Sequence, residues 1–69
     1  MPIYLADTNE NLTIVQITGE DKLKVHLENL GFIVGETIRL VSKTDDNVIV
    51  KIKGVSLAIS KELAKRILV

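Results

Sequence analysis

Apolar and polar residues alternate along much of this 69-residue chain, and the pattern indicates a small protein built mainly from strands. Alternation with period two places successive side chains on opposite faces of a sheet, and β-branched residues are frequent at the apolar positions. Strict alternation fails near Val15 and Gln16, so we expect a bulge or bend there. We predict strands over residues 12–17, 36–43, 48–53, 55–59 and 67–69, with the last most simply paired to the first.

The N-terminal residues carry a weaker version of the same signal. Ile3 and Leu5 alternate with their neighbours, which indicates an edge strand or a docking segment. The polar residues 7–11 then interrupt the pattern, and Asn9 or Asn11 is suited to hold a turn.

A helical period replaces the alternation over about residues 20–30. Thr18 or a residue close to it is suited to cap the start of this helix, and Gly31 is suited to end it in a left-handed backbone conformation. Four residues spaced as i, i+3, i+4 and i+7 define one stripe of about three turns, namely Leu23, His26, Leu27 and Leu30.

Glycines and short polar segments mark the turns between these elements. Gly35 permits a tight turn into the strand that follows it, Gly54 permits a second, and residues 44–47 form a polar hairpin turn. Ser60 is suited to cap a short helical turn near 60–65. Five or six short strands with one inserted helix predict a small, partly open barrel, because closing a bent sheet removes exposed edges.

Composition narrows the class of protein further. The length allows one domain over residues 1–69, and 46% hydrophobic residues against 3% aromatic ones imply an aliphatic core. The chain has 0 cysteines, which excludes a disulfide framework and a cysteine-based zinc site within it. Nine basic and nine acidic residues cancel, so neither charge nor stacking surface favours nucleic acid as a partner.

No part of the chain has the pattern of a signal peptide or a membrane span. The N-terminus lacks a basic start, and no apolar run approaches the roughly 20 residues that a membrane helix needs. We therefore expect a cytoplasmic protein without direct membrane insertion.

Several polar residues have a chemistry that could form a site, and each has a simpler structural interpretation. His26 is a potential metal ligand, but no other ligands are expected to converge on it, so we assign no metal site. Residues 45–47 are rich in oxygen yet lack the spacing of a calcium loop, which favours a plain turn. Arg39, Lys51 and Lys53 are expected to share one outer face, either simply solvated or facing an anion or an acidic partner.

Catalysis is not expected. Ser42, Ser56 and Ser60 have neither a second histidine nor a cysteine to complete a nucleophilic triad, and no glycine-rich phosphate loop occurs. We assign no catalytic residues and no cofactor.

The segment that joins the helix to the next strand is unusually apolar for a loop. Part of this cluster could cover the open end of the barrel as core, and part could accept a peptide from a protein partner. The candidate partner-binding residues are Leu30, Phe32, Ile33 and Val34.

Two strings in the sequence resemble the FeoA family of ferrous iron transport protein A. Residues 26–38, HLENLGFIVGETI, are similar to the family string RLxxLGxxPGxxV, and residues 54–60 with Ala64, Ile67 and Val69 are similar to its C-terminal pattern. Val34 stands where the family usually has proline, His26 where arginine is common, and residues 8–9 where Pro-Gly is frequent.

The resemblance implies an SH3-like barrel and a non-enzymatic accessory protein of ferrous iron transport. It further implies a protein partner, the cytoplasmic GTPase region of the FeoB transporter, whose activity or assembly the chain would modulate. The alternative is an SH3-like regulatory or peptide-binding module related to the C-terminal domain of iron-dependent, DtxR-like repressors. Self-association, nucleotide dependence and direct contact with iron stay open.

Overall fold

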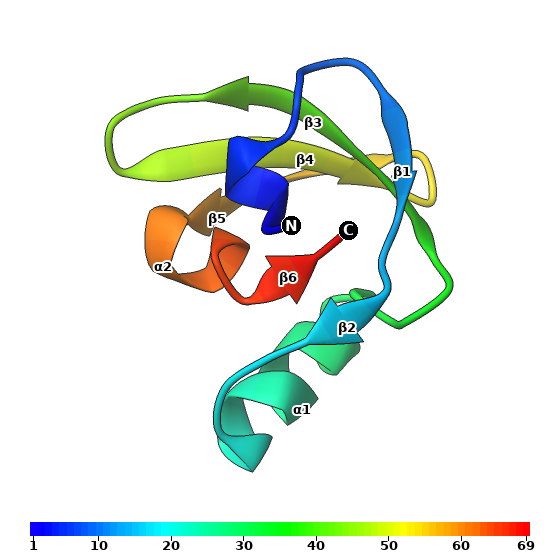
Figure 1. The fold of residues 1–69 in the computed structure, drawn as a ribbon, viewed down its shortest axis with the longest axis vertical. Helices are drawn as coiled ribbons and strands as arrows, with labels where there is room; N and C mark the ends of the chain where they lie inside the picture. The colour runs from blue at the N-terminus through cyan, green and yellow to red at the C-terminus, as the bar shows by residue number, and fades with distance from the viewer.

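The computed structural model describes residues 1–69 and contains six strands in two antiparallel sheets (Figure 1). The larger sheet has the order β1-β3-β4-β5, and the smaller one pairs β2 with β6. The mainly β architecture predicted from the sequence is therefore confirmed. The strands are β1 (Asn11–Thr13), β2 (Gln16–Ile17), β3 (Thr37–Lys43), β4 (Asn47–Ile52), β5 (Val55–Ser60) and β6 (Ile67–Leu68).

The first predicted strand is divided in two, at the place where its alternation fails. The Ile14 N–H donates to the Glu36 carbonyl (3.0 Å), and the Val15 N–H donates to the Leu68 carbonyl (2.8 Å). The same stretch of chain thus leaves the larger sheet after β1 and enters the smaller one as β2 (Figure 1). The predicted bend is confirmed, and so is the pairing of the last strand with the first, through β2.

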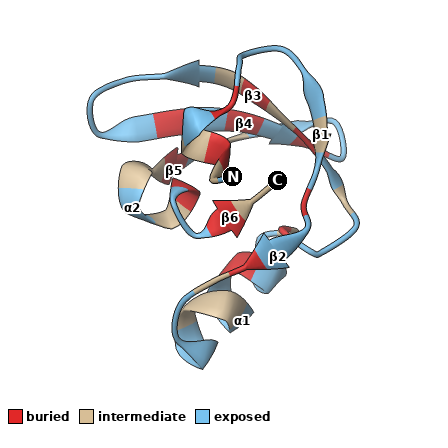
Figure 2. Ribbon diagram, viewed as in Figure 1, coloured by how far each residue is buried: buried red, intermediate tan, exposed pale blue.

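The central strands follow the predicted alternation. Val48, Val50 and Ile52 point inward and are buried, while the residues between them are exposed (Figure 2). β3 pairs with β4 with a shift in register between Leu40 and Ser42, and β4 pairs with β5 without one. With Ile38 and Leu40 of β3 and Ile59 of β5, the buried residues of β4 form one apolar face of the larger sheet, which lies on the core.

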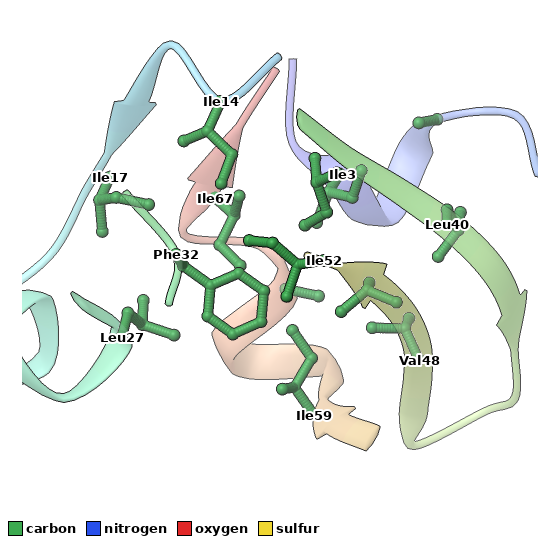
Figure 3. Packing of buried hydrophobic residues seen from close by; sticks show 14 residues of the cluster. Ile3, Ile14, Ile17, Leu27, Phe32, Leu40, Val48, Ile52, Ile59 and Ile67 are labelled. Carbon is green, nitrogen blue, oxygen red and sulfur yellow. The ribbon is translucent and has the colours of Figure 1, made fainter. Parts of the chain in front are cut away.

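The core is entirely apolar. It contains 14 buried residues, drawn from the sheets, the loops and every helical segment, and no polar or charged residue is buried. Phe32 lies in the middle of this cluster, with Leu27, Ile52, Ile59 and Ile67 around it in Figure 3. Aliphatic side chains therefore fill the interior around one aromatic ring, as the composition predicts.

The expected edge strand near the N-terminus is wrong. Residues Ile3–Leu5 form a 3₁₀ helix, η1, in which the Ala6 N–H donates to the Ile3 carbonyl (3.0 Å). Residues three apart share one face of a 3₁₀ helix, so Ile3 and Ala6 are both buried while Leu5 is exposed. Only Pro2 keeps an edge contact, as an isolated bridge to Leu68.

Helix α1 (Asp21–Asn29) confirms the predicted helix, but its start has no side-chain cap and its buried face is narrower than expected. Its N-cap residue is Glu20, without a side-chain capping hydrogen bond, whereas the Thr18 hydroxyl points to the Arg66 carbonyl. Of the predicted stripe, only Leu27 is fully buried, and His26 is exposed. The helix thus packs through a narrow line of contact.

The second helix, α2 (Lys61–Ala64), is a single turn that begins as predicted. The Ser60 hydroxyl accepts a hydrogen bond from the Leu63 N–H (3.2 Å), which satisfies one of the free donors of the first turn. No helical segment combines the length and the apolar character needed to span a bilayer.

Candidate functional site

The loop after α1 begins with a Schellman ending, which fixes the direction of the chain as it leaves the helix. The Phe32 N–H donates to the Leu27 carbonyl (3.0 Å), and the Gly31 N–H donates to the Glu28 carbonyl (2.9 Å). Gly31 adopts a φ of 102°, a conformation that a side chain would disfavour. The apolar contact that usually accompanies this motif joins Phe32 to Leu27, and both side chains are fully buried.

A β-turn follows immediately and returns the chain to the sheet. The Glu36 N–H donates to the Ile33 carbonyl (2.9 Å), so Val34 and Gly35 are the two central residues. Gly35 has a φ of 94°, as the third position of a type II turn requires. The Gly35 N–H also donates to the Ile14 carbonyl (2.8 Å), which ties the turn to the junction between β1 and β2.

Three apolar side chains of this ordered loop remain on the surface. Leu30 is 38% exposed, Ile33 46% and Val34 58%. We refer to these three residues as the apolar corner. Phe32 is 0% exposed and belongs to the core, so its inclusion among the partner-contacting residues is corrected: a side chain that fills the barrel interior has no surface to offer.

One exposed residue near the apolar corner was not predicted as part of a site. Val15 is 60% exposed and follows Ile14, whose backbone binds the turn at Gly35. The broken alternation at Val15 was the available signal, because a bend in the chain turns an apolar side chain away from the core.

The second surface feature is a shallow hollow of about 280 Å³ on the outer face of β1, β3 and β4. Arg39, Lys51 and Lys53 line it together, as predicted from their alternation. The Arg39 Nε and Nη2 atoms both donate to the Asn11 side-chain oxygen (3.1 and 3.0 Å). Lys53 lies 3.8 Å from Glu36, whereas neither Arg39 nor Lys51 has a carboxylate partner.

Of the remaining candidate residues, His26 lies one helical turn before Leu30 of the apolar corner, and its carbonyl accepts the Leu30 N–H (3.2 Å). His26 is exposed on α1, and the structure contains no group of three or more His, Cys, Asp or Glu residues that could hold a metal ion.

The oxygen-rich residues 45–47 lie in the hairpin turn between β3 and β4, as predicted. The Thr44 N–H donates to the Asn47 carbonyl (2.8 Å), and the Thr44 hydroxyl accepts the Asn47 N–H (3.1 Å). The Asp46 carbonyl accepts the Lys61 N–H (2.9 Å). The Asn47 carbonyl thus closes the hairpin, and the Asp46 carbonyl ties it to the start of α2.

Comparison with known proteins agrees with this geometry. The sequence model of the family described as the FeoA domain matches residues 1–69. No curated protein sequence matches the chain. The crystal structure of an iron uptake regulatory protein (FeoA) is similar with a TM-score of 0.88 and 26% identity, covering 97% of this chain and 91% of that one.

Two more distant structures share the fold. FeoA from Stenotrophomonas maltophilia, solved with zinc and described as a procaryotic SH3 domain protein, has a TM-score of 0.82 at 22% identity, covering 99% of this chain and 87% of that one. A manganese-dependent transcriptional repressor has a TM-score of 0.87 at 11% identity, covering 97% of this chain but only 39% of the repressor. The predicted SH3-like fold is therefore confirmed.

Proposed function

Because this chain belongs to the FeoA family, we propose that it is a non-enzymatic accessory protein of ferrous iron transport. In this proposal residues 1–69 act as one cytoplasmic domain that binds the GTPase region of the FeoB transporter and modulates its activity or assembly. The observation that carries the proposal is the apolar corner, three apolar side chains exposed together on an ordered loop. Their chemistry suits an apolar groove on a protein partner.

The loop is suited to docking because its backbone is already fixed. The Schellman ending holds it at one end, the turn at Gly35 holds it at the other, and Phe32 anchors it from inside the core. Association then orders few additional groups, which lowers the entropic cost of binding. Leu30, Ile33 and Val34 can enter a partner as a preformed unit.

The direct test is a binding measurement between the chain and the isolated GTPase region of the transporter, with and without nucleotide. Val34→Asp places a charge at the most exposed position of the apolar corner. We expect it to weaken binding by at least about tenfold, because a carboxylate in an apolar groove loses its hydration without gaining a partner. Its melting temperature should stay close to that of the unchanged protein.

Leu5→Asp serves as the matched control. Leu5 is 63% exposed, similar to Val34, but belongs to η1, which packs against α2 and β3. We expect this variant to bind normally. Equal binding by the Val34→Asp variant and the unchanged chain would reject the apolar corner as the contact surface, and no binding by the unchanged chain would reject this partner.

The likeness to the manganese-dependent repressor favours a second candidate function. In that case the chain is a regulatory SH3-like module that binds a peptide or proline-rich segment of a metal-sensing regulator. A panel of such segments from the regulators of the same cell distinguishes the two functions. Saturable binding to one of them, together with failure to bind the GTPase region, would favour the regulatory module.

A further inference from the structure

β5 is an edge strand that lacks the usual protection against pairing. It lies at the end of the strand order β1-β3-β4-β5, behind β4 in Figure 1, and it pairs with β4 over six residues without a bulge. Its sequence, VSLAIS, contains no charge, proline or glycine. Natural edge strands usually carry a lysine, a proline or a bulge that discourages further strands, so this edge is open to another one.

The pairing with β4 determines which backbone groups of β5 are free. The hydrogen bond from the Lys61 N–H to the Asp46 carbonyl lies at one end of this ladder. In an antiparallel pair, bonded positions alternate, so Val55, Leu57 and Ile59 direct their N–H and carbonyl groups toward β4. Ser56 and Ala58, both exposed, direct theirs outward, and these groups bind no other part of the chain.

We propose that β5 pairs with β5 of a second copy of this chain, antiparallel and about a twofold axis at Leu57. In this register Ser56 lies opposite Ala58 of the second copy, and Ala58 lies opposite Ser56. Each of these two pairs exchanges two hydrogen bonds. In each copy, the two N–H groups and the two carbonyls of Ser56 and Ala58 therefore all have partners. The two four-stranded sheets become one continuous sheet of eight strands.

The side chains of β5 are compatible with a second copy in this register. The small Ser56 and Ala58 face each other on the outer side, and no residue of β5 itself is charged. On the inner side, Val55 lies opposite Ile59 of the second copy. Val55 shares the core-facing side of β5 but is 55% exposed in the single chain, so pairing covers an apolar side chain that the monomer leaves in water.

The charges nearest the pairing belong to the two lysines that flank β5. In this register Lys53 lies toward Lys61 of the second copy, so like charges face each other at both ends of the strand pair and weaken it. The formal net charge of the chain is +0, so two copies have no overall repulsion. Lys53 lies near Glu36, and the Lys61 ammonium lies over the Tyr4 ring at 5.0 Å, so both basic groups at the ends of the strand have partners within their own chain. A contact of one strand pair is small, and we expect a weak, reversible dimer.

Sedimentation equilibrium of the full chain over a concentration series up to about 1 mM tests the proposal. We expect the unchanged protein to form a reversible dimer. Ala58→Pro removes an outward N–H that β4 does not use, and it should weaken the dimer by at least about tenfold. Ala58→Ser keeps that N–H and should dimerise like the unchanged protein, with circular dichroism confirming that both variants fold.

A pair of double variants tests the register itself. In Ser56→Glu with Ala58→Glu, carboxylates face carboxylates across the twofold axis, and the dimer should dissociate. In Ser56→Glu with Ala58→Lys, each Glu faces a Lys of the second copy, and the dimer should persist or strengthen. Glu at position 56 also lies opposite Lys51 of its own chain, which suits the monomer in both variants.

Two results would overturn the proposal. A chain that stays monomeric at every concentration excludes the second copy as the occupant of this edge. A dimer that Ala58→Pro leaves intact, or that both double variants affect equally, excludes this strand and this register.

Discussion

At the scale of single residues, the turns of this fold require a positive φ at particular positions, which glycine adopts more easily than other residues. Gly31, Gly35 and Gly54 were predicted as turn residues, and all three have positive φ values, of 102°, 94° and 78°. A β-carbon at these three positions would meet no atom within 4 Å, so only the backbone conformation disfavours a side chain there. The signal was local, and the sequence was sufficient to identify it.

Val34 occupies a position of the β-turn at which proline is favoured. It is the second residue of a turn whose third residue, Gly35, has positive φ, and no backbone partner accepts the Val34 N–H. We therefore expect Val34→Pro to stabilise the fold by about 0.4–1 kcal/mol, because proline restricts the unfolded chain. Urea denaturation monitored by circular dichroism measures the change.

Gly35→Ala is the companion substitution for this prediction. It forces a β-carbon onto the left-handed residue of the same turn, and we expect a loss of stability of about 1 kcal/mol or more. A destabilising Val34→Pro would show that Val34 does not have the backbone conformation of a type II turn.

At the scale of elements, Ser60 determines where β5 ends and α2 begins. Its hydroxyl accepts the Leu63 N–H, the only side-chain cap that either α-helix has at its start. We expect Ser60→Ala to cost about 1 kcal/mol of stability, as the loss of a capping hydrogen bond usually does. Thermal and urea unfolding at low protein concentration measure this cost.

Ser56→Ala is the matched control on the same strand. Ser56 is exposed and its hydroxyl binds no group of the chain, so the change in stability should stay within about 0.5 kcal/mol. Equal costs at the two positions would mean that the cap contributes nothing specific to α2.

At the scale of the whole molecule, one apolar core joins both sheets and all helical segments. Phe32 lies at its centre, although it comes from a loop. We expect Phe32→Ala to cost about 3–5 kcal/mol, a large share of the stability of a domain this small. Because the same core supports every element, the loss should lower the midpoint of a single unfolding transition.

Ile33→Ala is the control for this substitution at the adjacent position. Ile33 is 46% exposed, so we expect a cost of less than about 1 kcal/mol. Comparable losses at the two neighbours, or a separate unfolding step for α1, would contradict the idea of one shared core and of one domain over residues 1–69.

The sequence predicted much of this fold because most of its signals are local. Val48, Val50 and Ile52 recur at every second position, with Lys51 and Lys53 at the alternate ones, and this spacing indicates a strand with one buried face, wherever that strand lies. The same logic identified the basic face of Arg39, Lys51 and Lys53. It failed at Ile3–Leu5, because three residues are too few to separate period two from a 3₁₀ turn.

The sequence by itself determined the strands, the turns at glycine and the apolar character of the loop after α1, because periodicity and φ requirements act over a few residues. Only the tertiary structure decided that Phe32 turns inward while Leu30, Ile33 and Val34 stay outside, and that β5 keeps an open edge. Burial depends on which distant segments arrive to cover a side chain or pair with a strand. That information lies in the packing of the whole chain rather than in any one stretch of it.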